Sequence, residues 1–200
     1  MSRGDDPIRA RILDAAFAAF TEQGYAETTT LDIATRAQVS KRELYAKVGK
    51  KSEMLAACIE QRARRLRLPA YAPPPPDRES LTGLLEAFGA RFLLELTDPA
   101  VTAVFRLAIA EAERAPEVAR TLDRVGRDAS RNALREMLAH AQTARLIDAD
   151  PALVAEHFSA LLWGDLFVGL LLRVTARPTG KQLEQRARQA AAAIVRLYGL

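Results

Sequence analysis

The sequence is poor in the residues that carry covalent and metal chemistry, with one cysteine and two histidines among 200 residues. A lone cysteine excludes an intramolecular disulfide, which fits a reducing cytoplasm, and Cys58 is expected to be a small packed residue. His140 and His157 have no nucleophile or metal ligand at a recognisable spacing, and no glycine-rich phosphate-binding loop is present. The sequence therefore predicts no enzyme, no metal site and no cofactor.

Long apolar runs and strand patterns are missing as well. The most apolar stretch, residues 161–172, is 12 residues long and contains Asp165, whereas a membrane-spanning helix needs roughly 20 mostly apolar residues. The amino terminus has no apolar segment of the signal-peptide type, and no alternating segment is bounded by hairpin turns. We therefore expect an all-α cytoplasmic protein without a membrane span.

Signals for helix ends divide the chain into about nine helices. Pro7 suits the first turn of a helix that Gly24 is placed to end. The later starts are marked by a capping residue or by a proline in the first turn: Ser52, Asp77, Asp98-Pro99, Ala115-Pro116, Asp150-Pro151 and Pro178 with Gly180. The helix that opens at Pro116 is expected to be long and to include Met137.

Four consecutive prolines, residues 73–76, predict a stiff connection between two domains. We expect an amino-terminal domain over residues 1–51, a connecting helix and linker over 52–76, and a second domain over 77–200. Residues 1–68 hold 13 Lys and Arg against 9 Asp and Glu, whereas the rest of the chain holds 16 of each. This distribution favours a polyanionic partner for the amino-terminal part, with a solvated charged face as the alternative.

A helix-turn-helix pattern follows the first helix. Thr29, with Asp32 three residues later, forms the capping-box pattern of a short helix over about residues 30–37. The next three residues interrupt the helical period, and Ser40 suits the cap of a second helix over residues 41–47. The second helix carries hydrogen-bonding side chains that can reach base edges and phosphates.

An ordered series of residues runs through this stretch: Gly24-Tyr25, Thr28-Thr29, Ile33-Ala34, Ala37-Gln38-Val39-Ser40, Leu44-Tyr45 and Lys51. On these residues the chain resembles the TetR family of bacterial transcriptional regulators. It departs where Gln38 replaces the turn glycine, where Arg42-Glu43 stands for a frequent Gly-Thr, and where Lys47-Val48 stands for the common aromatic pair. The resemblance implies a homodimeric regulator, most simply a repressor, that binds a near-palindromic operator in double-stranded DNA.

Within this pattern we assign base reading to Lys41, Arg42 and Glu43. The forked guanidinium of Arg42 can bind guanine, and the Glu43 carboxylate can accept from cytosine. For Glu43 the alternative is a pairing within its own helix or with Arg36 that only orients its neighbours. Five residues are expected to bind phosphates: Thr29, Ser40, Tyr45, Lys47 and Lys51.

Residues 105–200 are similar to the AefR-type branch of the same family, which implies a cavity for a small hydrophobic ligand between the middle helices. The candidates to line it are Phe88, Phe92, Phe105, His157, Trp163 and Phe167. Plain core packing is the alternative for each aromatic residue.

The family dimerises through its last two helices, and the same helices are unusually apolar in this chain. The expected interface residues are Leu166, Leu170, Leu183, Ala187, Ala191 and Ile194. Burial of these residues in a monomeric core is the alternative.

The resemblance also implies a mechanism in which ligand favours a state with the helix of residues 52–68 swung. In this state the helix-turn-helix motifs of the two subunits are too far apart for successive major grooves. Two other hypotheses stay open: an all-α small-molecule-binding protein or enzyme whose basic amino terminus is incidental, and a nonspecific nucleoid-type binder. DNA binding and its dependence on sequence separate the three.

Overall fold

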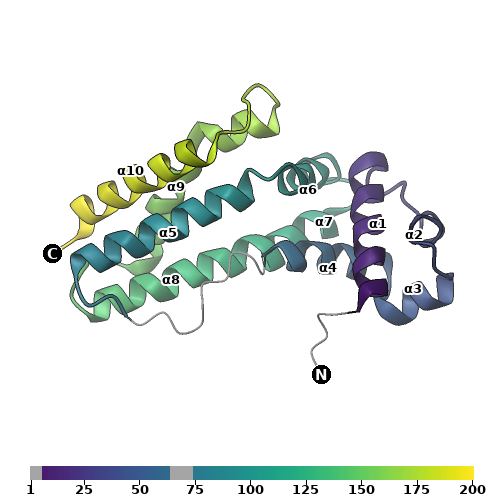
Figure 1. The fold of residues 1–200 in the computed structure, drawn as a ribbon, viewed down its shortest axis with the longest axis horizontal. Helices are drawn as coiled ribbons and strands as arrows, with labels where there is room; N and C mark the ends of the chain where they lie inside the picture. Colours follow the sequence, from purple (N-terminus) through teal and green to yellow (C-terminus); the bar gives the residue numbers. More distant parts are fainter. Residues whose placement is uncertain (1–5, 64–73) are drawn as a thin grey trace. The chain divides into compact units, whose positions relative to one another are not determined.

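The computed structural model describes residues 6–63 and 74–200, and these residues form helices and no strand (Figure 1). The helices are α1 (Pro7–Gln23), α2 (Thr30–Ala37), α3 (Lys41–Lys47), α4 (Lys51–Ala63), α5 (Arg78–Leu96), α6 (Pro99–Ala110), α7 (Pro116–Thr121), the π-helical stretch η2 (Leu122–Arg127), α8 (Asp128–Thr143), α9 (Pro151–Leu171) and α10 (Gly180–Tyr198). The prediction of an all-α fold is therefore confirmed. The described residues contain ten α-helices where about nine were expected.

Two compact units divide the helices, one made of residues 1–64 with 103–127 and the other of residues 65–102 with 128–200. The first unit has one core, in which Val104, Leu107 and Val118 join the buried residues of α1, α2, α3 and α4. We call it the reading unit, because it contains the helix-turn-helix. The core of the second unit is built from α5, α8, α9 and α10, and we call it the bundle unit.

The domain boundaries expected from the proline run do not coincide with these units. Met54 and Leu55 of α4 are buried in the core of the reading unit, so α4 belongs to that unit and is more than a connection. Residues 103–127 join the same core because their apolar side chains pack there. Residues 64–73 of the expected connection, which include Pro73, lie outside the described residues.

Most of the predicted helix starts are confirmed. Asp77, Asp98 and Asp150 each accept a backbone N–H in the first turn of the following helix, at 2.7, 2.8 and 3.2 Å respectively. Gly24 ends α1 with a positive φ of 92°, as expected for a glycine at that place. Local capping chemistry therefore sets most of the element boundaries.

One predicted start and one predicted helix length are wrong. Ser52 lies inside α4, and the Glu53 carboxylate instead accepts the N–H of Lys50, the residue before the helix, at 2.6 Å. The long helix expected from Pro116 is interrupted, because α7 passes into the π-helical stretch η2 before α8 begins. A π-helical stretch is a packing adjustment that the apolar spacing does not encode.

In the bundle unit, α10 packs along α5 and α9, as Figure 1 shows. Leu183, Ala187, Ala191 and Ile194 are all at most 2 % exposed and belong to the core of this unit. A Cβ added at Gly89 of α5 would lie 3.1 Å from that of Ala187, so small residues permit the close approach of the two helices. This stripe of α10 is the inner side of its own unit, which is the alternative that was open for these residues.

Helix α9 is long and apolar enough to cross a membrane by length and composition alone, which is weak evidence because the core helix of a soluble protein meets the same criteria. Its inner residues Val154, Phe158 and Leu162 are buried in the core of the bundle unit. The helix is also broken at Gly164, where φ is 35° and ψ is −136°. Arg186 of α10 donates through Nε to the carbonyl of Leu162, which the break leaves available.

Replacing Gly164 with alanine is expected to lower the free energy of unfolding by about 2 kcal/mol, because side chains disfavour this backbone conformation. The new Cβ would also lie 3.0 Å from Nη2 of Arg186. Gly83→Ala is the matched control, because Gly83 lies inside α5 with open space around it. This substitution should raise the free energy of unfolding by up to about 1 kcal/mol. Urea unfolding of both variants measures the difference, and equal stabilisation by both substitutions would contradict the assigned strain.

Candidate nucleic-acid interface

Two short helices, α2 and α3, form the helix-turn-helix in the reading unit (Figure 1). Both predicted caps are present: Thr29 makes a capping box with Asp32, and the Ser40 hydroxyl accepts the N–H of Glu43 at 3.1 Å. Ile33 of α2 and Leu44 of α3 are completely buried. Burial of one side of each helix leaves the other side of α3 in solvent.

The turn between the helices is made by Gln38, the residue that replaces the glycine of the family pattern. Gln38 takes the left-handed conformation, with φ 54° and ψ 47°, and is exposed. The turn is closed by the N–H of Val39, which donates to the carbonyl of Ala34 at 3.0 Å. The helix-turn-helix geometry thus forms without glycine, at the cost of some backbone strain.

Gln38→Gly is expected to raise the free energy of unfolding by about 1 kcal/mol, because glycine adopts the left-handed conformation without a steric penalty. Thr35→Gly, three residues earlier on the exposed side of α2, should lower it by a similar amount, because glycine weakens a helix interior. Thermal unfolding followed by circular dichroism measures both. A loss of stability in Gln38→Gly would show that the turn does not strain this residue.

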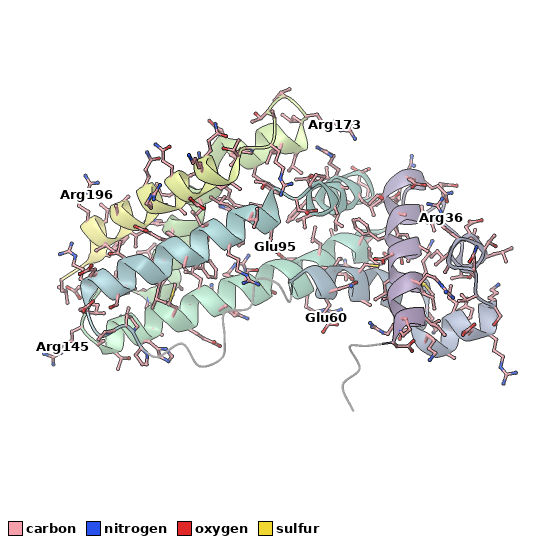
Figure 2. The ribbon with its side chains drawn as sticks, in the orientation of Figure 1. Arg36, Glu60, Glu95, Arg145, Arg173 and Arg196 are labelled. Atoms are coloured by element: carbon pink, nitrogen blue, oxygen red, sulfur yellow. The ribbon has the colours of Figure 1, made fainter. Side chains whose placement is uncertain are left out.

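The exposed side of α3 presents the side chains predicted to read bases. Lys41 and Arg42 are exposed in the first turn, and Glu43 is partly buried. Arg36, labelled in Figure 2, pairs with Glu22 through 2.7 Å, so the alternative in which Arg36 orients Glu43 is not what the structure shows. The base-reading roles of these residues stay predictions.

The predicted phosphate-binding residues have different surroundings. Thr29 donates its hydroxyl to Asp32 at 2.6 Å and its N–H to the same carboxylate at 3.0 Å, so both of its donors are used inside the protein. These bonds, with the one from the hydroxyl foremost, hold the pKa of the Asp32 carboxyl below its usual value. Ser40 accepts in its cap and keeps a hydroxyl proton to donate. Tyr45 is exposed, with its hydroxyl 3.3 Å from that of Thr30.

Lys51 differs most from its predicted role. Its Nζ lies 2.8 Å from the carbonyl oxygen of Tyr25, 3.2 Å from that of Ala26 and 3.0 Å from that of Thr28. It also lies 4.5 Å from the centroid of the Tyr25 ring, a cation–π contact. An ammonium group has three donors, and the three carbonyls of the α1–α2 loop occupy them. Lys51 therefore fixes this loop and has no donor left for a phosphate.

Lys47, on the last turn of α3, pairs with Asp6 through 2.7 Å. Sequence reasoning missed Asp6, although Asp6-Pro7 repeats the Asp-Pro pattern that marked two other helix starts. It also missed Glu111, whose Oε1 lies 3.5 Å from the N–H of Ala26 in the α1–α2 loop. The contact with Glu111 joins residues 85 positions apart, and no local signal predicts it.

The residues predicted to line a ligand cavity fall into three groups. Phe88, Phe92, Trp163 and Phe167 form a chain of ring contacts in the bundle unit, with centroids 5.8 to 6.0 Å apart. Phe105 instead packs against the core of the reading unit. His157 is exposed and hydrogen-bonds through Nδ1 to the hydroxyl of Tyr198.

Comparison with known proteins gives concordant results for both halves of the chain. Residues 12–58 match the family model described as bacterial regulatory proteins of the tetR family, and residues 83–200 match that of the AefR-like transcriptional repressor C-terminal domain. None of the curated protein sequences matches the chain.

Three solved structures illustrate the likeness. A TetR transcriptional regulator from Agrobacterium tumefaciens is 27% identical with a TM-score of 0.79, covering 97% of this chain and 95% of its own. The flavonoid-responsive regulator FrrA is 27% identical with a TM-score of 0.75, covering 96% and 97%. SmeT, the repressor of the Stenotrophomonas maltophilia multidrug efflux pump SmeDEF, is 22% identical with a TM-score of 0.63, covering 100% and 93%, and shares the fold.

Proposed function

The chain belongs to the TetR family of bacterial transcriptional regulators, and on this premise we propose that it is a cytoplasmic repressor that binds a near-palindromic operator as a homodimer and is released by a small apolar ligand. The observation that carries the proposal is the exposed side of α3, which presents Lys41 and Arg42 beside a buried anchor, Leu44. These side chains suit base edges in the major groove, which admits a helix of this size.

Two reading units are needed for two half-sites, which lie about 34–36 Å or a multiple apart on DNA. We place the partner on α9. Leu153 and Leu161, before the break at Gly164, and Val168, after it, are exposed apolar side chains of this helix. Leu172, which caps the carboxyl end of the helix, is 67% exposed. Exposed apolar side chains along one helix favour burial against a second copy.

The ligand is proposed to bind beside the ring chain of the bundle unit. Phe92 and Trp163 are partly exposed and meet edge to face, so a planar apolar molecule can add to the chain of rings. FrrA is described as flavonoid-responsive, and a neighbouring structure is a complex of SmeT with triclosan. We infer an aromatic ligand for this chain. Release requires that the ligand bind the DNA-free state more tightly than the DNA-bound state.

DNA binding is tested by incubating the full-length protein with fragments of the genome that encodes it and sequencing the retained fragments. We expect a near-palindromic motif, and sedimentation should give twice the chain mass of 21.9 kDa. Retention of fragments without a motif would favour a nonspecific binder. Absence of retention even at low salt would overturn the proposal in favour of a small-molecule-binding protein or enzyme.

Ligand release is tested with a panel of aromatic compounds that includes a flavonoid and triclosan. Trp163 is the only tryptophan of the chain, so its fluorescence reports binding nearby. A true effector should quench this fluorescence, raise the unfolding temperature and weaken operator binding. In Trp163→Leu the same compound should have smaller effects on the unfolding temperature and on operator binding, whereas the stability of the ligand-free variant should be unchanged. Stabilisation without loss of operator affinity, for every compound that binds, would contradict release by these compounds.

A further inference from the structure

The last turn of the proposed recognition helix carries a lysine that the protein already pairs with one of its own carboxylates. Nζ of Lys47 lies 2.7 Å from Oδ2 of Asp6, and both side chains are partly exposed, at 39% and 30%. Lys47 is one of the residues expected to bind a phosphate. In the free protein its ammonium therefore faces an oxygen anion supplied by the chain itself.

Asp6 has two tasks, one for each carboxylate oxygen. Oδ1 caps α1 by accepting the N–H groups of Ile8 and Arg9 at 3.1 and 3.4 Å, whereas Oδ2 accepts from Lys47. The bond from Lys47 is the main cause that lowers the pKa of Asp6, and the same bond raises the pKa of Lys47. The cap does not require the lysine, so the two tasks can be separated by substitution.

We propose that Asp6 competes with the phosphates of the DNA backbone for the ammonium group of Lys47. This competition lowers the affinity of the protein for DNA, whatever the DNA sequence. This inference rests on the proposed function. A carboxylate oxygen and a phosphate oxygen present the same acceptor to an ammonium group at the same distance. An exposed ion pair is weak enough to be exchanged when DNA binds. Lys47 then binds a phosphate only when its ion pair with Asp6 is broken. The net contribution of this phosphate contact to the free energy of DNA binding is therefore small.

Asp6→Asn separates the two tasks, because asparagine caps a helix as well as aspartate does but carries no charge. We expect this variant to bind operator and scrambled DNA alike about threefold more tightly, since the exchanged pair is lost. The dependence of log affinity on log salt should steepen by up to about one unit. Asp77→Asn is the matched control: it removes the same charge from another helix cap, that of α5, and should leave affinity unchanged.

Lys47→Ala in both backgrounds decides between competition and simple repulsion of DNA by Asp6. Competition predicts that Lys47→Ala costs more affinity in Asp6→Asn than in the wild-type chain, because only there is the lysine free to bind phosphate. Repulsion predicts that Lys47→Ala costs as much or more affinity in the wild-type chain, because removal of the lysine exposes the Asp6 carboxylate there. An equal or larger loss of affinity in the wild-type chain would overturn the inference.

Two further readouts keep the test decisive. Circular dichroism melting shows whether Asp6→Asn retains its helices, and Asp6→Ser, which keeps a capping oxygen, replaces it if it does not. Unchanged or weaker DNA binding by a folded Asp6 variant overturns the competition while leaving the regulator intact. Absence of DNA binding by the wild-type chain is the different outcome in which the proposed function itself fails.

Discussion

Lys51→Met is expected to weaken binding to every DNA sequence by about tenfold, a loss of about 1.4 kcal/mol, without flattening the salt dependence of binding. The ammonium of Lys51 bonds to the carbonyls of Tyr25, Ala26 and Thr28, so its loss releases the loop that leads into α2. Methionine keeps an apolar stem and removes the charge together with the three N–H donors. The reading helices are then less well placed, while the number of phosphate contacts is the same.

The same substitution should lower the free energy of unfolding by about 2 kcal/mol, because hydrogen bonds from a charged group are lost. Tyr25 is only 5% exposed, and burial raises the pKa of its phenol, so the loop is held inside the reading unit. Lys50→Met is the matched control, because Lys50 is the exposed neighbour and its loss should leave stability unchanged. Binding titrations from about 50 to 200 mM salt measure the slope.

A different pattern would restore the role that sequence alone suggested. If Lys51→Met left stability unchanged and flattened the salt slope by about one unit, Lys51 would be a phosphate ligand after all. The three carbonyl contacts would then be a feature of the DNA-free protein only.

Arg42→Ala is expected to change which bases are preferred, at one position in each half-site. Arg42 is exposed in the first turn of α3, and a guanidinium bound to both acceptors of a guanine discriminates by about 1–3 kcal/mol. A homodimer carries the substitution twice, so operator affinity should fall by about tenfold or more per half-site, while binding to scrambled DNA changes little. Operators substituted at every position, tested in competition, measure the preference.

Arg36→Ala is the control for Arg42, because it removes the same charge from the neighbouring helix. Its guanidinium is paired with Glu22 of α1, and no base contact is predicted for Arg36, so base preference should be unchanged. An Arg42→Ala protein that lost affinity equally for all operators would show that Arg42 binds phosphate and that another residue reads the base.

Local sequence chemistry predicted most of the helices and the turn between α2 and α3. Thr29 and Ser40 cap as expected because an N-cap depends on residues within one turn of each other. Gln38 shows the limit of a family pattern: the glycine is absent, yet the turn is made by a residue in the left-handed conformation. The departure changes the strain of the turn and leaves its path intact.

The contacts that decide the roles of side chains were not predictable in the same way. Lys51 looked like a phosphate ligand because lysine at a helix start near DNA usually faces solvent, whereas its partners come from a loop 23 to 26 residues away. The stripe from Leu183 to Ile194 looked like an interface, because apolar periodicity marks a side to be buried without saying which partner buries it. Here α5 and α9 bury it within the same chain.

A change in half-site spacing tests whether two reading units of this chain bind one palindrome together. An operator from the genomic selection is compared with the same operator lengthened at its centre by about five base pairs, half a helical turn. We expect the longer operator to bind no better than scrambled DNA, because the second α3 then faces the wrong side of the duplex. Equal affinity for both operators would contradict it, since each reading unit would then bind alone.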